Sequence, residues 1–145
     1  MSRCESLALV SCVGKKGTQP SAAKDLYQSD WFFKARKYVE QQGLDWCILS
    51  TKYGLVHRDT VIESYEQTLK VLPANQRRQW SEDVLNQIFQ DYSEVKLIRL
   101  FAGEYYRQYL VTRLEEAGYT VEVPLKGLGI GQQLSWFKSH TQVNV

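Results

Sequence analysis

The sequence predicts an α/β fold: a single domain over residues 1–145, with a mostly parallel sheet of about four strands and helices on both faces. Two observations carry this prediction. Short apolar runs alternate along the chain with longer segments whose apolar residues recur at helical spacing. The first three of these runs are nearly continuous, as in strands that are buried on both faces. Parallel strands joined by helices wind in a right-handed sense, which places helices on both sides of the sheet.

Four apolar runs are the expected strands. They span residues 7–13, 46–50, 95–102 and 119–123. The fourth run alternates apolar and polar residues, so we expect it at an edge of the sheet. Glycines follow the first and third runs and mark their ends.

Helical spacing predicts the segments between these strands. The expected helical regions span residues 21–42, 75–90, 104–117 and a short segment ending at 137. Ser21 is the expected N-cap of the first region and Gly43 its stop, while a polar interruption divides it into two helices, with Ser29 or Asp30 capping the second. Residues 54–73 show no regular pattern and are expected to form a functional loop. Residues 138–145 are expected to be frayed.

Composition limits the classes of function. The chain has 145 residues, of which 43% are hydrophobic, which suffices for one core. Eighteen Lys and Arg against sixteen Asp and Glu give a net charge of +2, which excludes a protein that coats nucleic acid by charge alone. Nine Tyr and four Trp against five Phe favour a local recognition surface.

Cysteine and histidine usage predicts a reduced, cytoplasmic protein without a metal or cofactor. Cys4, Cys12 and Cys47 form no CxxC pair, and no apolar run approaches the roughly 20 residues of a membrane span. His57 and His140 are too few for a metal cluster. Cys12 is expected to pack as a small apolar side chain rather than to act as a nucleophile.

Polar residues and glycines collect where each expected strand ends. Ligands of parallel sheets bind at the carboxyl ends of the strands, so we expect one binding rim there. Its candidate residues are Ser11, Lys15, Lys16, Ser50, Lys52, Tyr53, Gly54, Gly103, Tyr106, Gly129, Gly131 and Gln132. Tyr27 and Tyr65, from neighbouring segments, are added as aromatic binding residues.

Three segments of this rim allow two interpretations each. The glycines and lysines of residues 14–17 suit an anion loop, although a solvated turn is favoured. The glycines of residues 127–131 suit close approach of a ligand or a tight crossover turn, and the amide of Gln132 favours contact with a base or sugar. Lys52 and Tyr53 suit a phosphate and a stacked base, the alternative being a core tyrosine beside a solvated lysine.

Glu63 is the candidate general base, with Lys52 as its catalytic companion. It lies between the apolar residues 61–62 and Tyr65, which predicts an anchored backbone and a directed carboxylate. A surface ion pair with Arg58 or Lys52 is the alternative.

Several motifs together resemble a family of small bacterial and phage proteins of unknown function. They are Leu9 to Lys16, Asp25-Leu26-Tyr27, Phe32 to Ala35, Leu49 to Leu55, Ile62 to Tyr65, Ala102-Gly103 with Tyr106, and Pro124 to Leu134. Some of them also resemble the YaaA family of peroxide-stress proteins, which bind DNA. The arrangement is similar, more distantly, to the uracil-DNA glycosylase-like α/β fold. The resemblance implies that fold, a DNA or nucleotide partner, and a role in nucleic-acid modification, repair or genome defence.

The sequence therefore favours an N-glycosidase that acts on a base, modified or unmodified, in DNA or in a nucleotide. Tyr27 and Tyr53 would stack on the base, and Lys15, Lys16 and Lys52 would hold phosphate. Gln132 and the glycine loop would position the base or sugar, while Glu63 activates water. The alternatives are a non-catalytic DNA- or nucleotide-binding protein of the YaaA type and a scaffold subunit of a larger complex.

Overall fold

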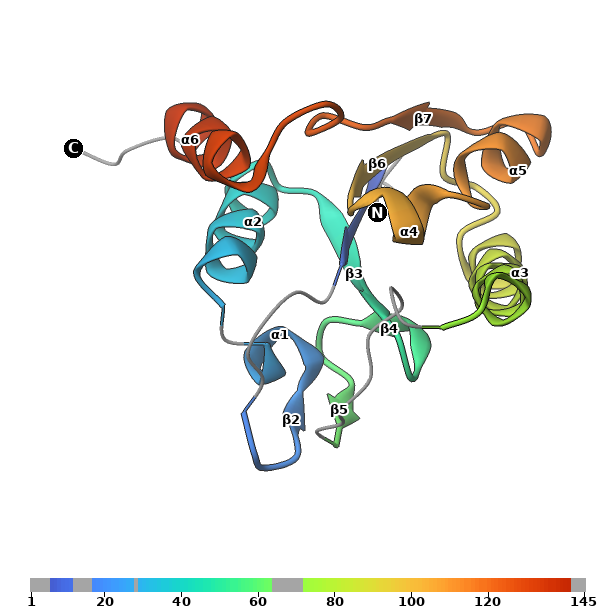
Figure 1. Cartoon of the computed structure of the whole chain (residues 1–145), viewed down its shortest axis with the longest axis horizontal. Coiled ribbons are helices and arrows are strands. Elements are labelled where there is room, and N and C mark those ends of the chain that lie inside the picture. Colours follow the sequence, from blue (N-terminus) through green and yellow to red (C-terminus); the bar gives the residue numbers. More distant parts are fainter. Residues whose placement is uncertain (1–5, 12–16, 28, 64–71, 142–145) are drawn as a thin grey trace.

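A five-stranded, mostly parallel sheet lies at the centre of the molecule, in the order β4-β3-β1-β6-β7 (Figure 1). The computed structural model describes residues 6–11, 17–27, 29–63 and 72–141. The strands are β1 (Ser6–Ser11), β3 (Asp45–Ser50), β4 (Gly54–His57), β6 (Leu97–Phe101) and β7 (Thr120–Glu122). All neighbours pair in parallel except β4, which is antiparallel to β3. The α/β prediction is confirmed, with five strands in this sheet instead of about four.

In the central sheet, strand β4 is the one that the sequence prediction missed, because residues 54–73 were expected to form a loop. A tight turn at residues 51–53 returns the chain antiparallel to β3. Further along the same segment, β5 (Val61–Ile62) pairs antiparallel with β2 (Ser21–Ala22) in a separate two-stranded sheet. Two strands of two to four residues carry too little periodicity to be distinguished from a loop by pattern alone.

The outer edge of β4 is capped by a side chain. The backbone N–H of Leu55 donates to Gln87 Oε1 at 2.9 Å, and Gln87 Nε2 donates to the Leu55 carbonyl at 3.3 Å. Gln87 thus takes the place of a neighbouring strand at this edge. Gly54 has a φ of +74°, and a Cβ there would lie 2.9 Å from Gln87 Oε1. The fold itself therefore requires the glycine that the sequence assigned to ligand binding.

Helices follow the predicted order with different boundaries. They are α1 (Ala23–Leu26), α2 (Asp30–Gln41), α3 (Ala74–Asp91), α4 (Glu104–Arg107), α5 (Val111–Glu116) and α6 (Ile130–His140). The Phe32 N–H donates to Ser29 Oγ at 3.1 Å, which confirms Ser29 as a cap, and Gly43 follows α2 with a φ of +69°. Ser21 as an N-cap is wrong, because it lies in β2. The frayed tail is wrong for residues 138–140, which continue α6, whereas residues 142–145 lie outside the described residues.

Side chains of β1 alternate between two cores, one on each face of the sheet. Ala8 and Val10 join the core that contains α2 and the buried Phe137 of α6, while Leu7 and Leu9 join the core of α3 and α5. Figure 1 shows α2 and α6 together and α3 on the other side of the sheet. The predicted helices on both faces are confirmed. None of the helices within the described ranges is long and apolar enough to cross a membrane.

Candidate functional site

The parallel strands β1, β3, β6 and β7 all end at one edge of the sheet, which we call the carboxyl edge. It comprises Ser11, residues 50–53, residues 102–103 and residues 123–129, which end or directly follow these strands. The chain passes from β1 to β3 on one side and later to β6 on the other, so β1 and β6 flank the point where the strand order reverses. Open α/β sheets bind ligands at that point. Of the predicted residues, Lys15, Lys16 and Tyr65 lie outside the described residues.

Two serines mark the ends of the central strands, and both are fully buried. Ser50 Oγ accepts from the Tyr53 N–H at 3.0 Å, and the Ser50 carbonyl accepts from Trp80 Nε1 at 2.9 Å. Ser11 Oγ, by contrast, is buried without a hydrogen-bond partner among the residues that the structure describes. An unpaired buried hydroxyl costs about 1–3 kcal/mol, so this atom is a candidate to bind a ligand at the reversal point.

Lys52, Tyr53 and Glu63 lie together beyond the end of β3. The Lys52 ammonium lies 5.3 Å from the centroid of the Tyr53 ring, and the Tyr53 hydroxyl donates to the Glu63 carbonyl at 3.5 Å. Lys52 and Glu63 are exposed and Tyr53 is half-buried. The structure thus brings together both predicted catalytic residues and one predicted stacking residue.

The expected alternative for Glu63, an ion pair with Arg58 or Lys52, does not occur among the residues that the structure describes. Arg58 Nη1 instead donates to Asp45 Oδ1 at 2.6 Å and to the Trp46 carbonyl at 3.3 Å. Because the Glu63 carboxylate is exposed, no enclosing wall fixes its direction. Its backbone is held close to Tyr53, and its side chain remains free to turn toward a ligand.

Tyr106 reaches the carboxyl edge from α4. Its hydroxyl lies 3.3 Å from Thr51 Oγ1, and its ring packs edge-on against Trp80 with centroids 5.6 Å apart. Thr51 and Trp80 were not predicted as site residues. Trp80 lies on the apolar face of α3, so its spacing indicated only a core position, and Thr51 differs little from any threonine in a turn.

The prediction that Tyr27 stacks on a base is wrong for this structure. Tyr27 is fully buried in the core beside α2, where its ring centroid lies 5.3 Å from that of Phe32. A stacking residue needs an accessible ring face. Tyr27 therefore acts in packing.

The two glutamines that follow the glycine loop are used by the fold. Gln132 Oε1 accepts from the Gly129 N–H at 2.9 Å, which caps the start of α6. Gln133 Oε1 accepts from Trp31 Nε1 at 2.8 Å, and Gln133 Nε2 donates to the Leu128 carbonyl at 2.9 Å, which fastens α6 to α2. The carbonyl oxygen of Gln132 is therefore engaged, which weakens its predicted contact with a base.

Gly129 and Gly131 are not required by the backbone. Neither has a positive φ, and the only atom within 4 Å of an added Cβ at either position is Gln132 Oε1, at 3.8 Å from the Gly129 position. Gly103, which precedes α4, has no atom within 4 Å of the added Cβ. Open space beside glycines at two helix starts permits close approach of a ligand to backbone N–H groups.

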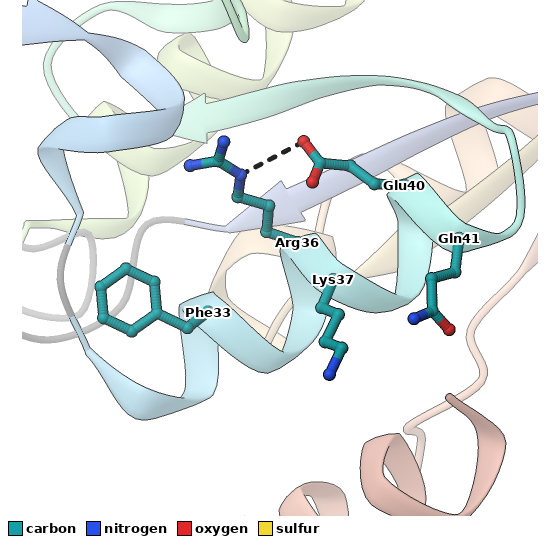
Figure 2. A pocket seen from close by; sticks show the side chains of 5 residues that line it. All are labelled: Phe33, Arg36, Lys37, Glu40 and Gln41. Carbon is teal, nitrogen blue, oxygen red and sulfur yellow. Dashed lines mark hydrogen bonds and ion pairs between the residues drawn. The ribbon is translucent and has the colours of Figure 1, made fainter. Parts of the chain in front are cut away.

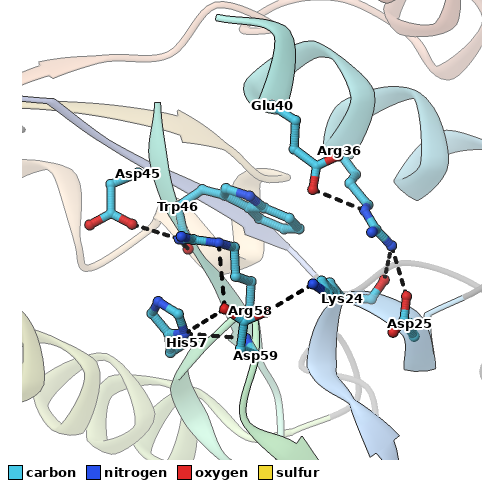
Figure 3. A network of polar contacts seen from close by, with 9 residues as sticks. All are labelled: Lys24, Asp25, Arg36, Glu40, Asp45, Trp46, His57, Arg58 and Asp59. Atoms are coloured by element: carbon cyan, nitrogen blue, oxygen red, sulfur yellow. Dashed lines mark hydrogen bonds and ion pairs between the residues drawn. The ribbon is translucent and has the colours of Figure 1, made fainter. Parts of the chain in front are cut away.

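Charged residues of α1, α2, β3 and β4 form a network that contributes to structure rather than to the carboxyl edge (Figure 3). Lys24 Nζ contacts Asp59 at 2.9 Å, and Arg36 contacts Asp25 at 3.0 Å. Further contacts link Arg36 to Glu40 at 3.2 Å and Arg58 to Asp45 at 2.6 Å. The Lys24 ammonium, through its hydrogen bond, holds the pKa of the exposed Asp59 carboxyl below its ordinary value. The network ties α1 to α2 and to the β4–β5 segment.

Two recesses formed by described residues lie away from the carboxyl edge. One, of about 400 Å³, follows the outer side of α2, where Figure 2 shows Phe33, Arg36, Lys37, Glu40 and Gln41. The other, of about 730 Å³, lies before β6 and β7, at the opposite edge of the sheet, and includes Phe89, Val95 and Tyr119. Neither contains a predicted site residue.

The described residues contain no reactive cysteine and no group of side chains that would bind a metal ion. Cys47 is buried, its Sγ lies 3.0 Å from the Tyr92 hydroxyl, and burial raises the pKa of its thiol to about 11. Such a thiol stays protonated and unreactive at neutral pH. No group of three His, Cys, Asp or Glu side chains within the described ranges is arranged to hold a metal ion.

Comparison with known proteins identifies a family but no activity. No curated protein matches the sequence. A family model matches residues 7–139, which include all of the described strands from Leu7 onward and nearly all of α6. The chain belongs to that family, described as a family of unknown function (DUF6884).

Proposed function

We propose that the carboxyl edge binds a nucleotide, either free or within a nucleic-acid strand. The observation that carries this proposal is the pair formed by Lys52 and Tyr53, with the ammonium 5.3 Å from the ring centroid at the end of β3. A half-exposed ring offers a surface on which a base stacks, and an exposed ammonium beside it offers a charge for phosphate. The turn that carries both is fixed by the hydrogen bond from the Tyr53 N–H to Ser50 Oγ.

Two further features support a nucleotide as the ligand. Within the described part of the chain, Ser11 Oγ is buried without a partner at the end of β1, and a ribose hydroxyl or phosphate oxygen would complete its hydrogen bonding. Gly131, in the first turn of α6, has open space where a Cβ would lie, so a ligand can approach the backbone at the start of this helix. The likeness of the sequence motifs to YaaA proteins and to the uracil-DNA glycosylase-like fold, and the role in nucleic-acid modification or genome defence that it implies, belong to this proposal.

A second candidate function is N-glycosidase activity, and the position of Glu63 favours it. The Tyr53 hydroxyl holds the Glu63 carbonyl at 3.5 Å, so the carboxylate is attached beside the ring that would hold the base. The carboxylate would take a proton from water as the water oxygen bonds to the sugar anomeric carbon. The bond from that carbon to the base nitrogen breaks, and the base leaves with a proton from solvent. Binding is placed first because the Glu63 side chain is exposed.

Nucleotide binding is tested by isothermal titration calorimetry with the four deoxynucleoside monophosphates. We expect Tyr53→Ala to weaken binding by about 5- to 100-fold, because a base loses its stacking surface. Lys52→Ala is expected to weaken it by about tenfold, as loss of a hydrogen bond to a charged group does. Lys37→Ala, on the outer side of α2, is the matched control. Absence of binding to the wild-type protein, or equal affinities for Tyr53→Ala and the control, would contradict the proposal.

The catalytic candidate is tested by base release from deoxynucleotides and from oligonucleotides that carry modified bases. Glu63→Gln removes the proton acceptor at nearly constant volume, so we expect a loss of about 100-fold or more in the rate with retained binding. Glu116→Gln, an exposed glutamate of α5, is the control. If neither the wild-type protein nor the control releases any base, the protein binds without catalysis.

A further inference from the structure

We propose that the start of α3 and the whole of α4 form an interface for single-stranded nucleic acid. Its residues are Arg77, Arg78, Tyr105, Arg107 and Tyr109, which we call the arginine–tyrosine face. This inference rests on the proposed nucleotide site, because it assigns the nucleotide bound there to a strand that continues along the face. Of these five residues, only Tyr105, which follows the third expected strand, belonged to the binding rim that the sequence predicted.

Arginines of α3 lie over tyrosines that belong to or follow α4. The Arg77 guanidinium carbon lies 5.1 Å from the Tyr105 ring centroid, and that of Arg78 lies 5.2 Å from the Tyr109 ring centroid. Arg77 also donates to the Leu72 carbonyl and to Gln108 Oε1, which fixes its position. A guanidinium over a tyrosine ring keeps those N–H donors that it does not use within the protein, and these are available to phosphate oxygens.

The arginines of the face outnumber the acidic residue of α4, the exposed Glu104, so the face carries a net positive charge. Within the described residues, Arg77, Arg78 and Arg107 form no ion pair, whereas the neighbouring Arg113 pairs with Glu82. Arg107 Nε is buried and has no hydrogen-bond partner among the described residues. A net charge of only +2 over the chain therefore coexists with two adjacent arginines, Arg77 and Arg78, that form no ion pair within the described residues. Such a local concentration of charge attracts a polyanion.

Exposed rings distinguish this surface from one that binds anions in general. Tyr105 is 42% exposed, and Tyr109 is half-buried. Alternating arginines and tyrosines can contact successive phosphates and stack on successive bases, as surfaces that bind single strands do. A duplex would keep its bases stacked inside and leave the tyrosine rings without partners, so a single strand fits this surface better.

The arginine–tyrosine face continues into the carboxyl edge. Tyr106, between Tyr105 and Arg107 in α4, contacts Thr51 through its hydroxyl at 3.3 Å. Trp80, one helical turn beyond Arg77 in α3, packs on Tyr106 and donates to the Ser50 carbonyl at 2.9 Å. A strand that lies over the face would therefore present a nucleotide to Lys52 and Tyr53, which follow Ser50 and Thr51 in the chain.

The test measures binding of fluorescently labelled twelve-nucleotide oligo(dT), oligo(U) and the corresponding duplex by anisotropy. We expect the wild-type protein to bind a single strand more tightly than the duplex and than thymidine monophosphate. Arg77→Gln/Arg78→Gln is expected to weaken binding at least tenfold and to reduce the slope of log K against log salt by about 1.4, since each phosphate contact contributes about 0.7. Tyr105→Ala is expected to weaken binding about 5- to 100-fold.

Lys34→Gln/Lys37→Gln removes the same charge from α2 and is the control, with an expected change below threefold. Arg78→Gln alone keeps the hydrogen bonds of Arg77, so it separates binding from folding, and melting temperatures check each variant. Equal losses in the control and in the arginine variant would overturn the interface, as would preference for the duplex.

The same measurements distinguish the interface from the nucleotide site. If Tyr53→Ala no longer binds the mononucleotide while Arg78→Gln loses affinity only for the oligonucleotide, the site and the face are both supported. If the wild-type protein binds mononucleotides but no oligonucleotide, the interface fails and the nucleotide site stands. If it binds oligonucleotides through the arginines but binds no mononucleotide, the interface is supported and the nucleotide site is contradicted. Oligo(dT) against oligo(U) decides between DNA and RNA.

Discussion

Two regions of the molecule use basic residues in opposite ways. In the ion-pair network of Figure 3, Lys24, Arg36 and Arg58 each contact at least one carboxylate at 3.2 Å or less. On the arginine–tyrosine face, Arg77 and Arg78 lie over tyrosine rings and contact no carboxylate among the described residues. Both regions are exposed to solvent at least in part, so burial does not account for the difference.

The difference indicates which charges are available to a partner. A cation that is paired with a carboxylate must lose that partner before it binds a phosphate, which offsets most of the gain. A cation over a tyrosine ring keeps its net charge and its orientation. The network therefore contributes to stability, and the face contributes to recognition, which the following substitutions examine.

The largest effect is expected at Trp80, on which the arginine–tyrosine face rests. Trp80→Ala removes a ring that is 7% exposed, so we expect a decrease of about 3–5 kcal/mol in the free energy of unfolding. Trp80→Phe keeps most of the volume but leaves the Ser50 carbonyl without its donor, at a cost of about 1–3 kcal/mol. Urea denaturation measures both values. A decrease below 1 kcal/mol for Trp80→Ala would show that the face has no rigid support.

Arg58 and Arg78 offer the most direct comparison of the two regions. Arg58→Gln removes the donor to Asp45 and to the Trp46 carbonyl, and we expect it to lower the free energy of unfolding by about 1–3 kcal/mol. Arg78→Gln is expected to change that free energy by less than about 0.5 kcal/mol, since its exposed side chain forms no hydrogen bond within the described part of the chain.

Oligonucleotide affinity is expected to show the reverse order, with a loss for Arg78→Gln and little change for Arg58→Gln. A double-mutant cycle with Asp45→Asn isolates the contribution of the Arg58–Asp45 pair. Equal stability losses at the two arginines would remove the distinction between the regions.

The sequence predicted the parallel strands because their continuous apolar runs reflect burial on both faces. β1, β3 and β6 are visible for this reason, and local chemistry limited the cap of α2 to Ser29 or Asp30, of which Ser29 is the cap. β4 was not predicted, since its pairing depends on a turn at residues 51–53 and on Gln87, which lies more than thirty positions further along the chain. Long-range partners of this kind leave no local pattern.

The candidate site was predicted in part for the same reason. Lys52 and Tyr53 follow a strand directly, so their place at the carboxyl edge could be read from the strand itself. Tyr27 was assigned wrongly because a tyrosine near the rim and a tyrosine buried under it give the same sequence signal. The arginines of α3 were missed because their role depends on tyrosines about thirty residues further along the chain.

The smallest expected effect concerns the pH dependence of the network. The hydrogen bond from Lys24 lowers the pKa of the Asp59 carboxyl in the folded protein below its ordinary value of 3.8. A carboxyl whose pKa is lowered by folding stabilises the folded state above the pKa of the unfolded chain, and this contribution is lost as the pH falls through the folded pKa. Asp59→Asn should therefore have a lower urea midpoint than the wild-type protein at about pH 7, and the two midpoints should converge as the pH falls below the lowered pKa of Asp59. Arg78→Gln has no carboxylate partner in the described part of the chain, so its difference from the wild-type midpoint should stay constant over the same range. A gap between Asp59→Asn and the wild-type protein that widens on acidification would show that the Lys24–Asp59 pair does not stabilise the fold.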